Sequence, residues 1–400
     1  MNTIKLTAMA FGLAAANAFA QSATEVQPTT EAPKAAEDKG VEFNISGRAE
    51  VDAYADAMTG DDQKFYHDYK TQLNLIFQAK FNDNWSAQVE IEGKASNEEP
   101  YLHYKGAYVQ YKRGDNFALK FGDLAFSEGA FSYYYFNDST IYAAGMREHE
   151  IRGVELDYKG LQFGLGFGRG KNNDRTCYSS ETFDCSLYGN SYDIHLAYQF
   201  DIAGQTFRPF INYKSWQEKD ANTLHAGLHT DLIFGPLDIH AVYGLHADRL
   251  KKSFPNATHA FLGEPTLNLG RVIVKAGAFF AIIDDDHPTI HETFYDYEIP
   301  EYKFAFGEFD FKVNDAFTAG FVGEWHTNTL DDTKELGTVT IGPRFYFNPF
   351  KKLEVTAYAF ADIPVGDDWE KEDHYKWVST YDYGSKDIMF EFGLETVFKF

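Results

Sequence analysis

The sequence has no apolar segment that could cross a membrane as a helix. Beyond the N-terminal region, its longest apolar run covers residues 276–283. That run is less than half of the roughly 20 residues that a membrane-spanning helix needs. Apolar residues at the 3.6-residue period of an amphipathic helix are also absent. These absences exclude a helical membrane protein and leave two all-β alternatives: a secreted soluble protein, or a membrane barrel.

Basic residues are scarce. The chain carries 36 Lys+Arg against 60 Asp+Glu, a net charge of −24, which disfavours nucleic acid and anionic surfaces as partners. Aromatic residues are abundant at 17%, with 26 Tyr and 37 Phe. An acidic, aromatic-rich chain without long apolar runs fits a soluble core poorly. It fits a β-barrel that presents its aromatic side chains to lipid.

The first forty residues have the composition of a leader and a linker. A short basic segment, residues 2–5, precedes an apolar segment, residues 6–16, and Ala18-Phe19-Ala20 has the form of a cleavage site. This pattern predicts a signal peptide over residues 1–20. Residues 21–40 are rich in Pro, Ala, Thr and charge and lack periodicity, which predicts a flexible tether.

Only two cysteines are present. Cys177 and Cys185 lie in one polar stretch, and in an exported protein such a pair predicts a local disulfide. Metal ligation is the alternative, although the stretch has no nearby histidine.

Apolar and polar residues alternate through most of the remaining chain. Examples are residues 41–52, 72–80 and 85–92, each about ten residues long, which is the length of a tilted transmembrane β-strand. From Ile388 the alternation continues to the C-terminal Phe400, so one face of the last strand is apolar to its end. Something apolar must cover that face.

The connections between these segments alternate between two kinds. Short polar turns are predicted at 82–84, 113–116, 159–160, 202–204, 235–236, 314–315 and 348–349. Longer polar stretches lie near 57–66, 126–149, 170–189, 215–221, 284–301, 328–336 and 363–387. Short turns at one end and long loops at the other are typical of transmembrane antiparallel β-barrels. We therefore predict an all-β barrel over residues 41–400 with about 18 strands, or about 16 if the weak segment 258–269 is not a strand. In such a barrel lipid covers the apolar face of the last strand, which closes the ring against the strand near Val41.

The C-terminal strand carries a resemblance to a known family. Gly393, Leu394, Phe398 and Phe400 are similar to the assembly signal that the outer-membrane insertion machinery reads, with Thr396 as a departure. Together with the predicted signal peptide and the two kinds of loops, the chain resembles Gram-negative outer-membrane porins from end to end. The acidic motif that many general porins carry in their third loop is not visible, so the subfamily stays open.

This resemblance implies a location and partners. We expect a barrel in the outer membrane, with short periplasmic turns, a periplasmic tether and long extracellular loops. The expected partners are the lipid bilayer, lipopolysaccharide, the assembly machinery and small hydrophilic solutes, with a homotrimer as one possible state.

The resemblance also implies that the loop near 126–149 folds inward and narrows the channel. Candidate constriction residues are Glu128, Tyr133, Tyr134, Tyr135, Asp138 and Glu148. The aromatic side chains could stack on sugar rings, or they could pin the loop to the inner wall.

Strand parity, with apolar side chains outward, predicts the lining of the channel. The basic residues sent inward are Arg48, Lys120, Arg208, Lys214, Lys275 and Arg344. Acidic residues outnumber them on the same face, which predicts a preference for cations.

The same parity sends a group of histidines inward: His225, His229, His240 and His246. If Gly235-Pro236 is a two-residue turn, Asp231 lies opposite His240 and His225 opposite His246. These histidines could form a metal site or a pH sensor, or they could simply contribute to a polar wall.

The predicted function is a passive porin for small hydrophilic solutes, cation-preferring and with sugars as a possible cargo. We expect no enzymatic activity, cofactor or metal. Asp284-Asp285-Asp286-His287 is the one compact acid/His cluster of the kind found in barrel enzymes, and solvated charge or a weak Ca²⁺ contact explains it equally well. The alternative function is a plugged surface barrel whose extracellular loops bind a polymer, a host or an envelope component.

Overall fold

A computed structural model describes residues 40–58, 65–95, 100–127, 148–168, 192–215, 223–247, 257–282, 301–327, 337–365 and 388–400. The chain divides by its contacts into residues 1–41 and 42–400, and every described strand belongs to the second unit. The predicted signal peptide and all but the last residue of the predicted tether lie outside the described residues. No helix among the described residues is long and apolar enough to cross a membrane.

The second unit is built from strands. Their bounds are β1 (Glu42–Met58), β2 (Phe65–Lys80), β3 (Trp85–Ala95), β4 (Tyr101–Lys112), β5 (Phe117–Ser127), β6 (Glu148–Tyr158), β7 (Leu161–Gly168), β8 (Tyr192–Tyr198), β9 (Phe200–Ile202), β10 (Gln205–Ser215), β11 (Thr223–Phe234), β12 (Leu237–Ala247), β13 (Ala257–Asn268), β14 (Val272–Ile282), β15 (Glu301–Lys312), β16 (Phe317–Thr327), β17 (Gly337–Phe350), β18 (Leu353–Val365) and β19 (Met389–Lys399).

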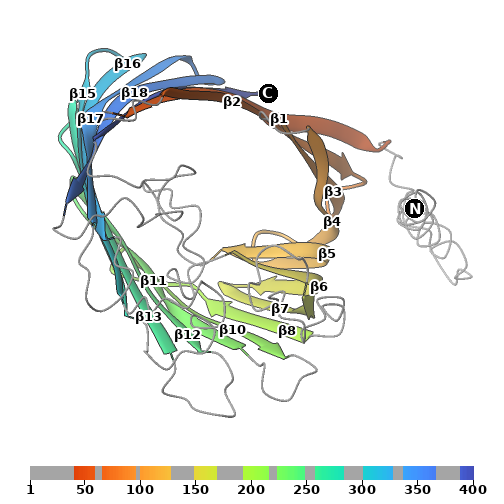
Figure 1. Cartoon of the computed structure of the whole chain (residues 1–400). Helices are drawn as coiled ribbons and strands as arrows, with labels where there is room; N and C mark the ends of the chain where they lie inside the picture. Colours follow the sequence, from red (N-terminus) through yellow and green to blue (C-terminus); the bar gives the residue numbers. More distant parts are fainter. Residues whose placement is uncertain are drawn as a thin grey trace, which may run out of the picture. The chain divides into compact units, whose positions relative to one another are not determined.

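The strands form one closed antiparallel barrel (Figure 1). Strands adjacent in the chain pair with one another, and β1 pairs with both β2 and β19. β8 and β9 both pair with β10 and are separated only by Gln199, so together they make one interrupted strand. The described residues therefore form an 18-strand barrel. This confirms the predicted fold and selects 18 strands over 16, because the weak segment 258–269 is the core of β13.

The last residue of the chain takes part in the closure. The Phe400 N–H donates to the Gly47 carbonyl at 3.0 Å, and the Gly47 N–H donates to the Phe400 carbonyl at 3.1 Å. Figure 1 shows the C-terminus beside β1 and β2. The prediction that the last strand closes the ring against the strand near Val41 is confirmed.

The short turns follow from their residues. Lys159 and Gly160 both have positive φ, at 49° and 85°, as a type I′ turn requires. Gly235 has a φ of 65° before Pro236, and this two-residue turn pairs Phe234 with Leu237 as predicted.

One predicted short turn is wrong. Asn348-Pro349 lies inside β17, and the turn is formed by Lys351-Lys352. The register between β17 and β18 shifts between Phe347 and Phe350. Because Pro349 has no N–H to donate, it is tolerated at such an irregularity near the end of a strand.

The predicted inward loop is shorter than expected at both ends. Phe126 and Ser127 belong to β5, and Glu148 and His149 belong to β6, where Ser127 pairs with Glu148. Residues 128–147 lie outside the described part of the chain.

The two faces of the sheet differ in chemistry. On β19 the large side chains of Phe390, Phe392 and Leu394 are exposed, whereas Glu391 and Glu395 point to the opposite face. On that opposite face, side chains from strands that are not neighbours touch. Tyr346 on β17, for example, donates to Glu308 on β15 at 2.5 Å. Such convergence identifies the concave, inner face, because side chains on the convex face diverge.

Candidate functional site

The inner wall of β14–β17 carries one charged group that we call the β14–β17 ion cluster (Lys275, Glu308, Asp310, Arg344 and Tyr346). The Lys275 Nζ lies 3.2 Å from Glu308 Oε2 and 2.8 Å from Asp310 Oδ2. The Arg344 guanidinium lies 3.7 Å from Glu308 Oε2, and Tyr346 donates to the other oxygen of this carboxylate. The two carboxylates are almost fully buried and lie against two bases, so the cluster contributes little net charge to the inner face.

A second network joins β5, β6, β7, β8 and β10. Lys120 Nζ and Gln162 Nε2 both donate to Glu155 Oε1 at 2.8 Å. Gln162 Oε1 accepts a hydrogen bond from Arg208 and lies 3.2 Å from His195 Nε2. Gln162 therefore links a base–acid pair on one side to Arg208 and His195 on the other.

His195 is fully buried at the edge of this network. Its ring stacks on Phe126 with centroids 4.0 Å apart, and its Nδ1 lies 2.5 Å from Asn212 Oδ1. Asn212 Nδ2 is buried without a hydrogen-bond partner among the described residues. Turning the Asn212 amide over would allow Nδ2 to donate to His195 Nδ1, so we assign the amide in that orientation.

The wall from β18 through β19 to β1 is acidic. Glu50, Asp52 and Glu395 place one carboxylate oxygen each within 4.8 Å of one another, and Arg48 contacts Glu50 and lies 3.8 Å from Glu395. Arg48 therefore contacts two of these three acids.

Further acids lie nearer the long-loop end of the same strands. Asp56 and Glu391 are in register, and Tyr358 donates to Glu391 at 2.7 Å. Thr340 donates to Asp362, which pairs through its backbone with Met389. We call Asp56, Asp362 and Glu391 the upper acidic group. Glu391 and Asp362 thus each accept a hydrogen bond from a hydroxyl group.

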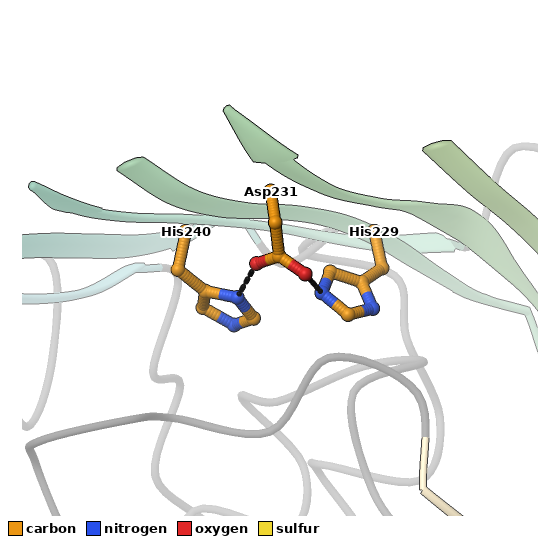
Figure 2. A group of neighbouring side chains, drawn as sticks. All are labelled: His229, Asp231 and His240. Atoms are coloured by element: carbon orange, nitrogen blue, oxygen red, sulfur yellow. Dashed lines mark hydrogen bonds and ion pairs between the residues drawn. The ribbon is translucent and has the colours of Figure 1, made fainter. Parts of the chain in front are cut away.

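The β11–β12 hairpin, which we call the histidine hairpin because it carries His225, His229, His240 and His246, has the predicted register. Asp231 pairs with His240, and His225 pairs with His246. Asp231 Oδ1 lies 2.8 Å from His240 Nδ1, and Asp231 Oδ2 lies 3.1 Å from His229 Nε2 (Figure 2). The two imidazole rings stand edge to face with centroids 4.8 Å apart. The side chain of His246 lies outside the described set.

The remaining predicted site residues are only partly described. Lys214 is buried on the inner face, in register with Asp193. Glu148 was expected in the constriction loop and instead is the first residue of β6. The predictions that lie outside the described residues are Glu128, Tyr133, Tyr134, Tyr135, Asp138, the Cys177–Cys185 disulfide and the Asp284–His287 cluster.

The glycine of the predicted assembly signal has a packing role. A Cβ on Gly393 would lie 2.0 Å from Cζ of Tyr358, so only glycine leaves room for this ring across the strand pair. The same ring carries the hydroxyl that binds Glu391. Leu394 and Phe398, by contrast, are exposed on the outer face.

The sequence interpretation missed a charged group on the outer face. Asp123 Oδ1 accepts from Arg152 Nε at 2.7 Å, and its Oδ2 accepts from the Tyr104 hydroxyl at 2.8 Å and from the Ala107 N–H at 3.2 Å. The β4–β5 ladder ends at the pair Tyr108–Gly122, so the carboxylate takes the place of a backbone acceptor where the strands part. An acid–base pair on otherwise apolar parity positions was the available signal.

Comparison with known proteins shows the fold. No family model matches the sequence, and no curated protein matches it. Among solved structures, Pseudomonas aeruginosa OccK9 (OpdG) matches with a TM-score of 0.56 and 12% identity, covering 90% of this chain and 99% of that chain. Acinetobacter baumannii OccAB3 matches with a TM-score of 0.52 and 10% identity, covering 89% of this chain and 100% of that chain. Pseudomonas aeruginosa OccK3 (OpdO) matches with a TM-score of 0.52 and 14% identity, covering 89% of this chain and 96% of that chain. These structures are outer-membrane porins, and the chain has their fold.

Proposed function

We propose that this protein is an outer-membrane porin that passes small hydrophilic solutes by diffusion and prefers cations. One observation carries the proposal: a closed 18-strand barrel has an apolar outer face and an inner face lined by charged and polar side chains from nearly every strand. An apolar belt suits lipid, and a polar interior suits water and dissolved solutes. The porin fold of the compared structures supports the same function and an outer-membrane location.

The cation preference rests on the distribution of charge along the inner wall. Lys120, Lys275 and Arg344 lie in contact with carboxylates, which neutralise their positive charge. The upper acidic group gathers three carboxylates on the adjoining strands β1, β18 and β19. A channel with such a wall concentrates cations near it.

The inner wall near Ser127 and Glu148 offers an apolar surface to an inward loop. Leu124, Phe126 and Ile151 form a buried apolar cluster on the inner face, next to the strand ends that this loop joins. An apolar platform favours the interpretation that the tyrosines of the loop pin it to the wall over the interpretation that they stack on sugars. We extend the proposal to a constriction formed by this loop.

The direct test is conductance of the purified protein in a planar lipid bilayer. A porin gives stable, uniform current steps, whereas a plugged barrel gives no steps. Absence of conductance from protein that is folded, as judged by heat-modifiable migration on a gel, would contradict the proposal.

A plugged surface barrel is the second candidate, and one observation favours it. Phe279 and Phe304 stack on the inner face with centroids 5.3 Å apart and are only 1% and 2% exposed. Aromatic side chains buried on the inner wall imply that part of the interior is filled at β14–β15. If filling extends across the barrel, the long loops would carry the function by binding a polymer, a host or an envelope component.

A further inference from the structure

Three side chains on the inner wall of the β11–β12 hairpin lie in an arrangement that suits a metal ion. His229 and Asp231 are two residues apart on β11, so they project from the same face. His240 lies directly across the strand pair from Asp231. One donor atom from each of the three residues lies within 4.8 Å of the others. Figure 2 shows the three side chains converging on one side of the sheet.

The distances are close to those of a metal site. In a tetrahedral zinc site with bonds of about 2.0–2.1 Å, neighbouring donor atoms are roughly 3.3 Å apart. Here the Asp231 oxygens lie 2.8 Å and 3.1 Å from the nitrogens of His240 and His229. Widening these separations by a few tenths of an ångström, through small side-chain rotations, would admit an ion.

The donor set selects a class of ion. Two imidazoles and one carboxylate suit Zn²⁺, Cu²⁺, Ni²⁺ or Fe²⁺, whereas Ca²⁺ and Mg²⁺ require mostly oxygen ligands. We infer that His229, Asp231 and His240 bind a divalent first-row transition-metal ion on the inner wall of the barrel. Because the wall supplies three ligands, the remaining coordination positions face the interior and are open to water or solute donors.

The charges around the three residues favour a cation. Glu264, which is buried, lies in register with His240 on the far side from Asp231 and adds negative charge. Arg208 lies in register with His229 and is the nearest base by strand register. Its guanidinium, however, donates to Gln162 on β7, three strands away from β11. The Asp231 side chain is 46% exposed, so an ion can reach the three residues from the side of this carboxylate.

Zinc titration of the full-length protein, purified without a polyhistidine tag, tests the inference. Isothermal titration calorimetry with Zn²⁺ at pH 7.5 should show one site that is at least tenfold weaker in His240→Ala and in Asp231→Asn. His225→Ala is the matched control, because His225 lies four residues along the same face of β11 and outside the three ligands. It should bind Zn²⁺ as the unmodified chain does.

A conservative variant separates ligation from support of the fold. His240→Gln retains a side chain that can donate to Asp231, but its amide is a poor ligand for zinc. This variant should fold as a heat-modifiable barrel and still lose the Zn²⁺ site. Unchanged Zn²⁺ affinity in folded His240→Gln, or no binding by the unmodified chain at millimolar Zn²⁺, would overturn the inference.

Calorimetry does not depend on channel function. Zinc binding by a protein that shows no conductance would leave this inference intact and contradict the porin proposal. Conductance without zinc binding would support the porin proposal and contradict the metal site.

Discussion

The outer and inner faces of β19 share eleven residues of backbone and have opposite chemistry. Outward, Phe390, Phe392, Leu394 and Phe398 are exposed. Inward lie two glutamates together with Gly393, whose missing Cβ makes room for a tyrosine. The outer face demands only that side chains be apolar. On the inner face the identity of each side chain matters. Each charged group either pairs with a neighbouring side chain or interacts with the contents of the barrel.

The inner face is itself divided. On β14–β17 each carboxylate of the ion cluster touches a base, whereas in the upper acidic group Asp362 and Glu391 each accept from a hydroxyl group. The same residue types therefore have two roles. In the cluster they pair with one another, and in the acidic group we propose that they attract cations.

The largest effect is expected on the outer face at the point of closure. Phe400→Ser should reduce the amount of heat-modifiable barrel in the outer membrane severalfold, because it removes the apolar end of the closing strand. Membrane fractionation and gel migration measure this. Lys399→Ser is the matched control on the inward side of the same strand end and should assemble normally. Normal assembly of Phe400→Ser would show that the terminal residue is not an assembly signal.

The ion cluster predicts a stability difference between buried and exposed inner pairs. Lys275→Met should leave Asp310 as a buried charge without its base and Glu308 with Arg344 alone, at a cost of about 3–5 kcal/mol. Lys399→Met breaks the exposed pair with Glu354, which should cost no more than about 1 kcal/mol. Urea unfolding of the protein in detergent measures both. Equal costs would mean that water reaches the cluster as freely as it reaches the rim.

The acidic group predicts a change in selectivity. The double variant Asp56→Asn/Glu391→Gln removes two inward negative charges and should lower the cation preference in a salt gradient. Glu354→Gln is the control, because this acid already contacts Lys399. If only the control changes the reversal potential, the selective charges lie at the short-turn rim.

The histidine hairpin predicts the smallest effect, a change of conductance between pH 5 and 8, where imidazole normally titrates. Protonation at low pH adds positive charge to the wall, so a cation-preferring channel should conduct less at pH 5 than at pH 8. Substitution of His225 or His246 by Ala should weaken this dependence. Single-channel recording between pH 5 and 8 measures this change. Conductance that does not vary with pH in the unmodified protein would show that these histidines do not affect conduction.

Alternation along the strands was enough to predict the barrel, its closure and the pairing of Asp231 with His240. These features follow from period two and from one two-residue turn, both of which are local. The roles of Gln162 and Tyr346 could not be predicted in this way. They depend on which non-neighbouring strands converge inside the barrel, and that depends on the tilt and stagger of the closed sheet.

Two other features were predicted wrongly or missed because the neighbouring strand decides them: the turn at Asn348-Pro349 and the charged residue Asp123. Asn348-Pro349 is a strong turn signal, yet the strand continues past it because β18 accommodates a shift in register. Asp123 lies on the outward parity and is acceptable there only because the β4–β5 ladder ends beside it. The two cysteines still stand as a predicted disulfide, which mass spectrometry under non-reducing conditions would test.

The central claim is a water-filled channel whose inner wall favours cations. The most direct test is the reversal potential of the unmodified protein in a planar bilayer with a KCl gradient. We expect stable current steps and a reversal potential of cation-selective sign. A potential near zero or of anion-selective sign, or no current from a folded barrel, would contradict it.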